Sequence, residues 1–212
     1  MNYFIVTFYK IVSFFSHIKK TVIHTNLNKN GELINLISFP ESFIEDQSSF
    51  KNFCFGNKDL SYSGCGVIAV YNALFALNKT NNRLDFLSLI SIFEKNGTPF
   101  NGLIGISPFA VYSFFKSRNY TTEKITSSDK NKINNFSSKY DYFICLIYND
   151  SRKIKSGLHY LFIEKKQAEN NNFTFISHNP NCMSNELDSL IRKINNGKAK
   201  PLFTIGISPQ IK

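Results

Sequence analysis

One apolar segment constrains the fold of this chain more than any other part of the sequence. Residues 67–77 read Val-Ile-Ala-Val-Tyr-Asn-Ala-Leu-Phe-Ala-Leu and are apolar on almost every side of a helical projection. A helix without a polar face is stable in water only when other parts of the chain surround it. A chain of 212 residues is long enough to build one such core. The sequence therefore predicts one compact domain, or two small lobes, around a buried helix over 67–77.

Helices and strands are expected in separate halves of the chain. Further helices are predicted over Leu84–Lys95, from Ser107-Pro108 through Arg118, and over Leu187–Ile194. Strand-forming residues dominate four short runs, Tyr142–Tyr148, His159–Lys165, Phe173–Ser177 and Pro201–Ile207. Helices followed by mostly consecutive strands indicate an α+β class, with a helical lobe over about 49–120 against an antiparallel sheet over about 140–212.

The residues before the buried helix have weaker patterns. Thr25–Gly31 is polar and typical of a turn, and Leu33–Phe39 is expected to be a short strand that Pro40 ends. Ser49–Gly64 mixes Ser, Asn, Gly and Lys and is expected to be a loop. We therefore separate a lead-in over residues 1–48 from a main domain over 49–212.

The amino-terminal segment, residues 3–18, is rich in apolar residues. They recur at three- and four-residue spacing, which predicts an amphipathic helix: Phe4, Phe8, Ile11, Phe15 and Ile18. Sixteen residues are short for a membrane span, Lys10 interrupts them, and no small-residue cleavage site follows. We expect a packed helix in a cytoplasmic protein. An interfacial membrane contact or an uncleaved anchor remains open.

The formal net charge of +10 could indicate a polyanionic partner. However, only four of the 25 basic residues are arginine, and no basic run is long enough for a nucleic-acid arm. A lysine-rich coding bias explains the same composition. We therefore expect no specific nucleic-acid partner.

Cysteine spacing argues against a metal or disulfide framework. The chain has Cys54, Cys65, Cys145 and Cys182, irregularly spaced and without a CxxC pair. Four cysteines in 212 residues are also far fewer than in disulfide scaffolds. We expect free thiols in a reducing compartment and no metal or organic cofactor.

Cys65 has the setting of a nucleophile. The segment Ser63-Gly64-Cys65-Gly66 places it at the amino terminus of the buried helix. Unpaired N–H groups and the helix dipole there favour the thiolate, and the flanking glycines allow a close approach of a substrate. A buried structural cysteine is the alternative interpretation.

His159 is the best candidate for the base that such a thiol needs. It begins a strand after a polar loop, whereas His17 and His24 lie in or near the first helix. If the following hairpin turns near 169–170, paired positions sum to about 339, which brings Asn179 beside His159. An Asn side chain can accept from the imidazole N–H and orient the ring. His178 would point to the other face of its strand.

The same residues carry a family resemblance. The segment from Ser63 to Leu74 resembles the nucleophile helix of papain-like cysteine peptidases, and is most similar to the bacterial bacteriocin-processing (double-glycine) peptidases. Gly97–Tyr120 resembles their glycine loop and following helix. Gly157-Leu158-His159-Tyr160 and Ser177-His178-Asn179-Pro180 resemble their His strand and the Asp/Asn-Pro that follows.

The resemblance implies a papain-like fold and a hydrolase that cleaves peptide or amide bonds with Cys65, His159 and Asn179. The family carries a glutamine shortly before the cysteine for the oxyanion. This chain has none between Phe50 and Cys65, and Asn57 is the nearest amide that could donate. The expected partner is a peptide or protein substrate. Deamidation, acyl transfer, or a domain that only binds peptide remain open on the same scaffold.

Overall fold

The chain is organised as two units, and the boundary between them falls inside helix α6 (Pro108–Lys116). The computed structural model describes residues 7, 18–77, 82–150, 157–168, 172–194 and 196–209. One unit comprises Thr7–Val111, and the described part of the other begins at Tyr112. The amphipathic helix expected over residues 3–18 lies outside the described residues, apart from Thr7 and Ile18.

The first unit is built around helix α4 (Cys65–Ala76), as the apolar segment predicts. Every residue from Cys65 to Leu74 is buried. Helix α5 (Arg83–Asn96) packs beside it and begins where Asn82 accepts a hydrogen bond from the Asp85 N–H. Aromatic rings pack between these helices: the ring centroids of Tyr71 in α4 and Phe86 in α5 are 5.4 Å apart. Phe50, in the short helix η1 (Gln47–Phe50), lies 4.9 Å from Phe86.

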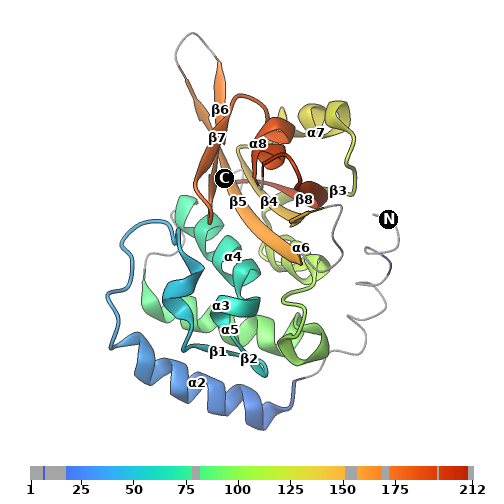
Figure 1. Cartoon of the computed structure of the whole chain (residues 1–212). Coiled ribbons are helices and arrows are strands. Elements are labelled where there is room, and N and C mark those ends of the chain that lie inside the picture. The colour runs from blue at the N-terminus through green and yellow to red at the C-terminus, as the bar shows by residue number, and fades with distance from the viewer. Residues whose placement is uncertain are drawn as a thin grey trace. The chain divides into compact units, whose positions relative to one another are not determined.

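Helix α2 (Lys20–Ile34) corrects the expected turn over Thr25–Gly31 and strand from Leu33. It runs beside α5 and the first hairpin (Figure 1). Its buried face carries Asn26 and Asn30 as well as apolar residues. The apolar residues alone therefore do not show a helical periodicity in the sequence. The two side-chain amides can be buried because each has hydrogen-bond partners, which are Gly56, Glu94 and Cys54.

The segment expected to be a loop over Ser49–Gly64 is more ordered than its composition indicates. Besides the end of η1, it holds a two-stranded hairpin, β1 (Cys54–Phe55) and β2 (Lys58–Asp59), and the short helix α3 (Leu60–Ser63). Phe53, Phe55 and Leu60 are fully buried, or nearly so. These apolar residues, spaced between polar ones, hold the segment to the core.

The second unit contains one six-stranded antiparallel sheet with the order β3-β8-β4-β5-β6-β7. The α+β class is confirmed, and four strands lie where the sequence predicts them: β4 (Tyr142–Tyr148), β5 (Leu158–Gln167), β6 (Phe173–His178) and β8 (Lys200–Ser208). The edge strands β3 (Thr121–Ile125) and β7 (Cys182–Ser184) were not predicted. The last strand, β8, lies between β3 and β4, an order that sequence patterns do not determine.

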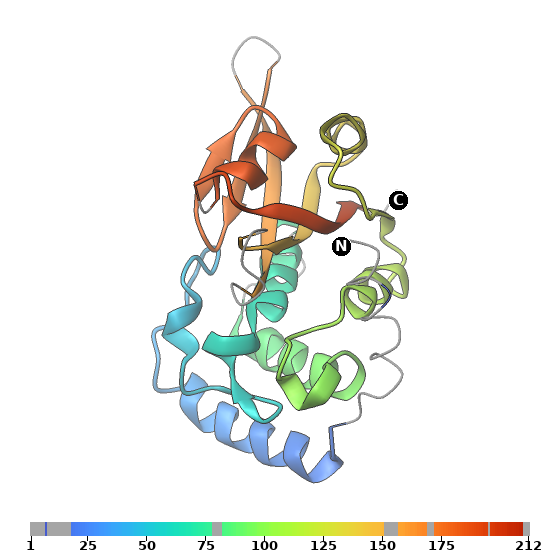
Figure 2. The ribbon, with the colours of Figure 1, turned by 45° about the vertical axis from the view of Figure 1, so that its right-hand side comes forward.

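Two short helices cover one face of this sheet. They are α7 (Lys130–Ser137), which the sequence does not signal, and α8 (Leu187–Lys193), which it predicts. Ile133 of α7 and Leu190 of α8 belong to one buried cluster with alternate residues of β4 and β5, such as Cys145 and Leu161. Both views show the helices beside the strands (Figures 1 and 2).

Within the described ranges, no helix has the length and apolar character needed to cross a bilayer.

Candidate active site

Cys65 is the first residue of α4, and the chain reaches it through a tight connection from α3. The Gly64 N–H donates to the Leu60 carbonyl at 2.7 Å. A Cβ on Gly64 would collide with the side chain and carbonyl of Leu60, so only glycine fits there. Cys65 is buried, with 8% of the residue exposed. The connection thus places the thiol at a helix amino terminus, where the N–H groups favour negative charge.

Two polar side chains that sequence reasoning did not use hold α3 in place. Asp59 caps its amino terminus and accepts from the Tyr62 N–H at 2.8 Å. Hydrogen bonding from Ser61 lowers the pKa of Asp59, although partial burial opposes this. The Gln47 amide donates to the carbonyls of Leu60 and Ser61 at 2.9 and 2.7 Å. The spacing of Asp59 before Tyr62 was a capping signal that could have indicated α3.

Asn72 anchors the nucleophile helix from within the core. Its side chain accepts from the Ile44 N–H at 2.9 Å and donates to the Ile44 carbonyl at 3.0 Å. Both residues are buried away from water. The two hydrogen bonds therefore satisfy the N–H and carbonyl groups of Ile44, which would otherwise have no partner. The pair ties α4 to the segment before η1 and limits movement of the helix that carries Cys65.

His159 and Asn179 are in contact in the second unit. His159 lies in β5, and its Nε2 atom is 2.6 Å from the main-chain oxygen of Asn179. The β5–β6 ladder pairs Phe162 with His178, so paired positions sum to 340, one more than predicted. The ladder stops there, and Asn179 turns the chain with φ of 57°. The Asn179 carbonyl is therefore the acceptor at Nε2, and the orienting role expected of the Asn179 side chain stays a prediction.

This contact determines which ring nitrogen of His159 can act as a base. A carbonyl oxygen accepts hydrogen bonds and donates none, so Nε2 must carry the hydrogen. In the neutral ring, the lone pair is then on Nδ1. The second unit therefore presents a histidine whose Nδ1 can take a proton.

His178 has a different environment. Its Nε2 lies 3.2 Å from Glu164 Oε1, and its ring stacks on Phe162 at 5.5 Å. Burial raises the pKa of Glu164, but hydrogen bonds from His178 and Lys166 outweigh it and leave that pKa below its usual value. Since side chains alternate along a strand, Phe162 and Glu164 lie on the face of β5 opposite His159. His178 is thus a buried hydrogen-bond partner of Glu164.

A pocket of about 430 Å³ adjoins His159 within the second unit. Its lining residues come from the end of β4, the start of β5, the β6–β7 turn and the end of α8: Asn149, His159, Pro180, Asn181, Cys182 and Ile194. The buried Ser177 hydroxyl donates to the Pro180 carbonyl at 2.8 Å and supports the turn from inside. Cys182, which had no expected role, shares this pocket with the candidate base.

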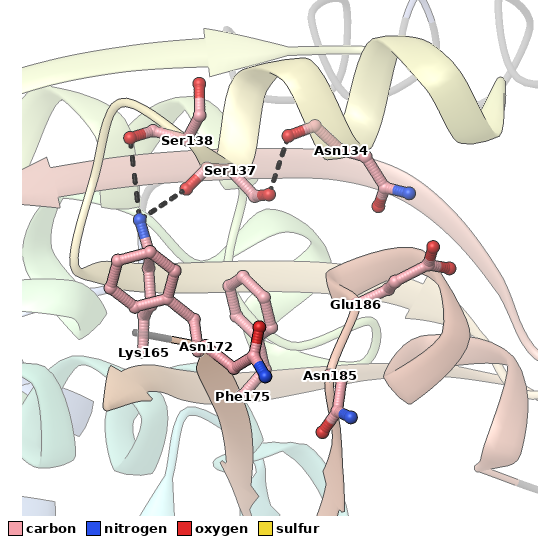
Figure 3. Close-up of a pocket in the computed structure, with 9 residues that line it drawn as sticks. Asn134, Ser137, Ser138, Lys165, Asn172, Phe175, Asn185 and Glu186 are labelled. Atoms are coloured by element: carbon pink, nitrogen blue, oxygen red, sulfur yellow. Dashed lines mark hydrogen bonds between the residues drawn. The ribbon is translucent and has the colours of Figure 1, made fainter. Parts of the chain in front are cut away.

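A second, larger pocket of about 550 Å³ lies between α7, the β5–β6 hairpin and the start of α8 (Figure 3). Lys165 reaches across its edge toward the carbonyls of Ser137 and Ser138, at 3.4 and 3.5 Å. Glu186, on the opposite side, is 2.9 Å from Lys130 Nζ. This pocket contains none of the candidate catalytic residues.

The remaining candidates have structural settings of their own. None of the four cysteines is in a disulfide, and burial raises the pKa of Cys145 to about 12. Asn57 lies in the exposed turn of the β1–β2 hairpin, where its N–H donates to the Asn101 carbonyl at 2.8 Å. Its role toward an oxyanion stays a prediction. Among the described residues, no group of three His, Cys, Asp or Glu side chains could hold a metal ion.

Comparison with known proteins finds no protein-family model and no curated protein that matches this chain. Among solved structures, the chain is similar to the peptidase domain of Streptococcus ComA, a bi-functional ABC transporter involved in a quorum-sensing pathway. The sequence identity is 13% and the TM-score is 0.45, with 69% of this chain and 91% of that chain covered. At this level of similarity, conclusions about chemistry rest on the residues described above.

Proposed function

We propose that this chain is a papain-like cysteine hydrolase that cleaves a peptide or amide bond. Cys65 is the nucleophile, His159 the general base, and Asn179 the residue that orients the imidazole. One observation carries the proposal: the 2.6 Å contact between His159 Nε2 and the Asn179 carbonyl, which leaves Nδ1 as the basic atom. A thiol at a helix amino terminus and a histidine held in one tautomer are the two parts that this chemistry needs.

The reaction follows from these parts. His159 Nδ1 takes the proton of the Cys65 thiol, and the thiolate attacks the carbonyl carbon of the substrate. The tetrahedral intermediate collapses when the imidazolium gives its proton to the leaving amine, and an acyl thioester on Cys65 remains. His159 then takes a proton from water, which attacks the thioester and releases the acid and the free thiol.

The oxyanion of the intermediate needs hydrogen-bond donors. Main-chain N–H groups at the start of an α-helix point out of its first turn, and we propose that those at the start of α4 donate to the oxyanion. Asp59 is committed to capping α3 and, as a carboxylate, donates nothing. We assign the main-chain N–H at Cys65 as the principal donor, with the Asn57 amide as the candidate side chain.

The test compares alkylation of each cysteine with cleavage of peptides. At pH 6, iodoacetamide should label Cys65 at least about tenfold faster than Cys54, because of these two thiols only Cys65 lies at a helix amino terminus and has His159 as its proposed base. His159→Ala should remove that difference. Incubation of the wild-type chain with a complex peptide mixture should produce new amino termini that Cys65→Ala does not produce.

Equal, slow labelling of Cys65 and Cys54 would contradict the activated thiol. Fast labelling of Cys65 combined with peptide binding and no new amino termini would identify a domain that binds peptide without cleaving it. Release of ammonia without chain cleavage would identify a deamidase.

A further inference from the structure

The pocket beside His159 has the size and supports of a binding site. Its volume of about 430 Å³ lies within the range of small ligand sites, roughly 300–1,000 Å³. One wall, the turn from Asn179 to Cys182, is held by the buried Ser177 hydroxyl and by pairing of Ser177 with Cys182. Ile194, at the end of α8, is buried and closes another side. The pocket is therefore formed before any ligand arrives.

Its position relative to His159 identifies the part of a substrate that would enter. The imidazolium gives its proton to the leaving amine, so that nitrogen must come within about 3 Å of the ring. One residue of an extended chain spans about 3.5 Å, so the side chain next to the leaving amine falls beside His159. A deamidase substrate releases ammonia and has no side chain to place there. The pocket thus favours cleavage of a peptide bond.

The lining chemistry indicates which side chains fit. Asn149 and Asn181 bring carboxamide groups, and Cys182 brings a thiol. Among the described residues that line the pocket, none is acidic, so none of them offers a counter-charge to a cationic side chain. It would also meet the imidazolium that forms during the reaction, in a chain with a formal net charge of +10.

We propose that this pocket binds the side chain of the residue that follows the scissile bond, and that it selects uncharged carboxamide or hydroxyl side chains over cationic ones. Cys182 determines the space available. The proposal rests on the hydrolase function proposed above, because the leaving side is defined by proton transfer from His159.

The first experiment uses matched peptides that differ only in the residue after the cleaved bond. Gln and Lys have similar length, so the comparison isolates charge. We expect kcat/KM for the Gln peptide to exceed that for the Lys peptide by about tenfold or more. The loss of one polar contact, or one repulsive charge interaction, changes kcat/KM by about that factor. Cys182→Phe should lower kcat/KM for the Gln peptide by a similar factor. Cys54→Ser, a thiol change outside the pocket, is the matched control.

The second experiment does not need catalysis. In the full-length Cys65→Ala variant, Gln-Gly amide mimics the leaving product and should shift the NMR signals of the His159 ring saturably. It should also slow modification of Cys182 by methyl methanethiosulfonate, while modification of Cys54 proceeds unchanged. Lys-Gly amide should do neither at the same concentration. This measurement uses the native Cys182 and avoids any folding defect of Cys182→Phe.

Peptide cleavage that is insensitive both to the leaving residue and to Cys182→Phe would overturn this inference and leave the hydrolase function intact. Protection of Cys182 by Gln-Gly amide without any peptide cleavage would support the pocket and contradict the hydrolase. Equal protection by the Gln and Lys compounds, or protection by neither, would overturn the inference.

Discussion

The imidazole of His159 is held by the main chain of Asn179, through a contact of 2.6 Å between Nε2 and the carbonyl oxygen. Asn179 has a φ of 57°, in the left-handed region that Asn and Gly adopt most readily. The residue type at 179 therefore matters for the backbone conformation that presents the carbonyl.

Replacement of Asn179 separates the role of its backbone from that of its side chain. Asn179→Gly keeps the carbonyl and tolerates positive φ, so Cys65 should be alkylated at a rate within about threefold of wild type, a change of less than 1 kcal/mol. Nitrogen-15 NMR should still find the hydrogen of the neutral His159 ring on Nε2. A loss of tenfold or more, about 1.4 kcal/mol, would instead show that the side chain orients the ring.

Gly64 is predicted to be intolerant of any side chain, because a Cβ there would meet the carbonyl and side chain of Leu60. Gly64→Ala should lower the free energy of unfolding by about 1–3 kcal/mol, the usual cost of overpacking. Gly31→Ala is the matched control, since nothing lies within 4 Å of a Cβ at that position in α2. It should raise stability by about 0.5–1 kcal/mol. Denaturant unfolding measures both, and equal effects would contradict the packing described.

The hydrogen bonds that Glu164 receives from His178 and Lys166 predict a loss of stability in acid. The pKa of Glu164 is below its usual value, because the hydrogen bonds from His178 and Lys166 outweigh burial. A lowered carboxyl pKa stabilises the fold above the unfolded pKa, and that contribution is lost as pH falls through the folded value. Glu164→Gln should lower the free energy of unfolding by about 1–3 kcal/mol at neutral pH. It should also weaken the dependence of that free energy on pH below about pH 5.

The control for this variant is Lys139→Ala, which removes a 3.7 Å ion pair with Glu123. Both side chains there are more than half exposed. Its effect should stay below about 0.5 kcal/mol at any pH. A similar acid profile for Glu164→Gln and wild type would show that the hydrogen bonds of Glu164 do not carry this pH dependence.

Glu94 predicts the opposite pH dependence. Burial raises its pKa, although hydrogen bonds from Asn26 and the Gly56 N–H oppose the shift. Its Oε2 atom is buried and has no hydrogen-bond partner among the residues that the structure describes. A raised carboxyl pKa means that the fold binds the proton more tightly, so stability declines as pH rises from the unfolded value through the folded one. Glu94→Gln should become more stable relative to wild type as pH rises through that range. Parallel pH profiles in chemical unfolding would contradict this.

Local patterns account for the elements that the sequence predicted correctly. Helix α4 lacks polar residues on almost every side, and β4 is a run of strand-forming residues between polar stretches, so each is evident without its neighbours. Helix α2 is different, because Asn26 and Asn30 lie on its buried face. Their burial depends on Gly56, Cys54 and Glu94, which are distant in sequence. No local period could indicate those partners.

The sequence by itself determined the buried helix behind Cys65, the α+β class and the approximate pairing of the strands around His159. These features depend on apolar periodicity and turn residues within short windows. Only the tertiary structure decided that β8 lies between β3 and β4, that Cys182 shares a pocket with His159, and that the carbonyl of Asn179 contacts the ring. The physical reason is that a one-residue change in register reverses where a side chain points, and packing across the whole sheet selects the register.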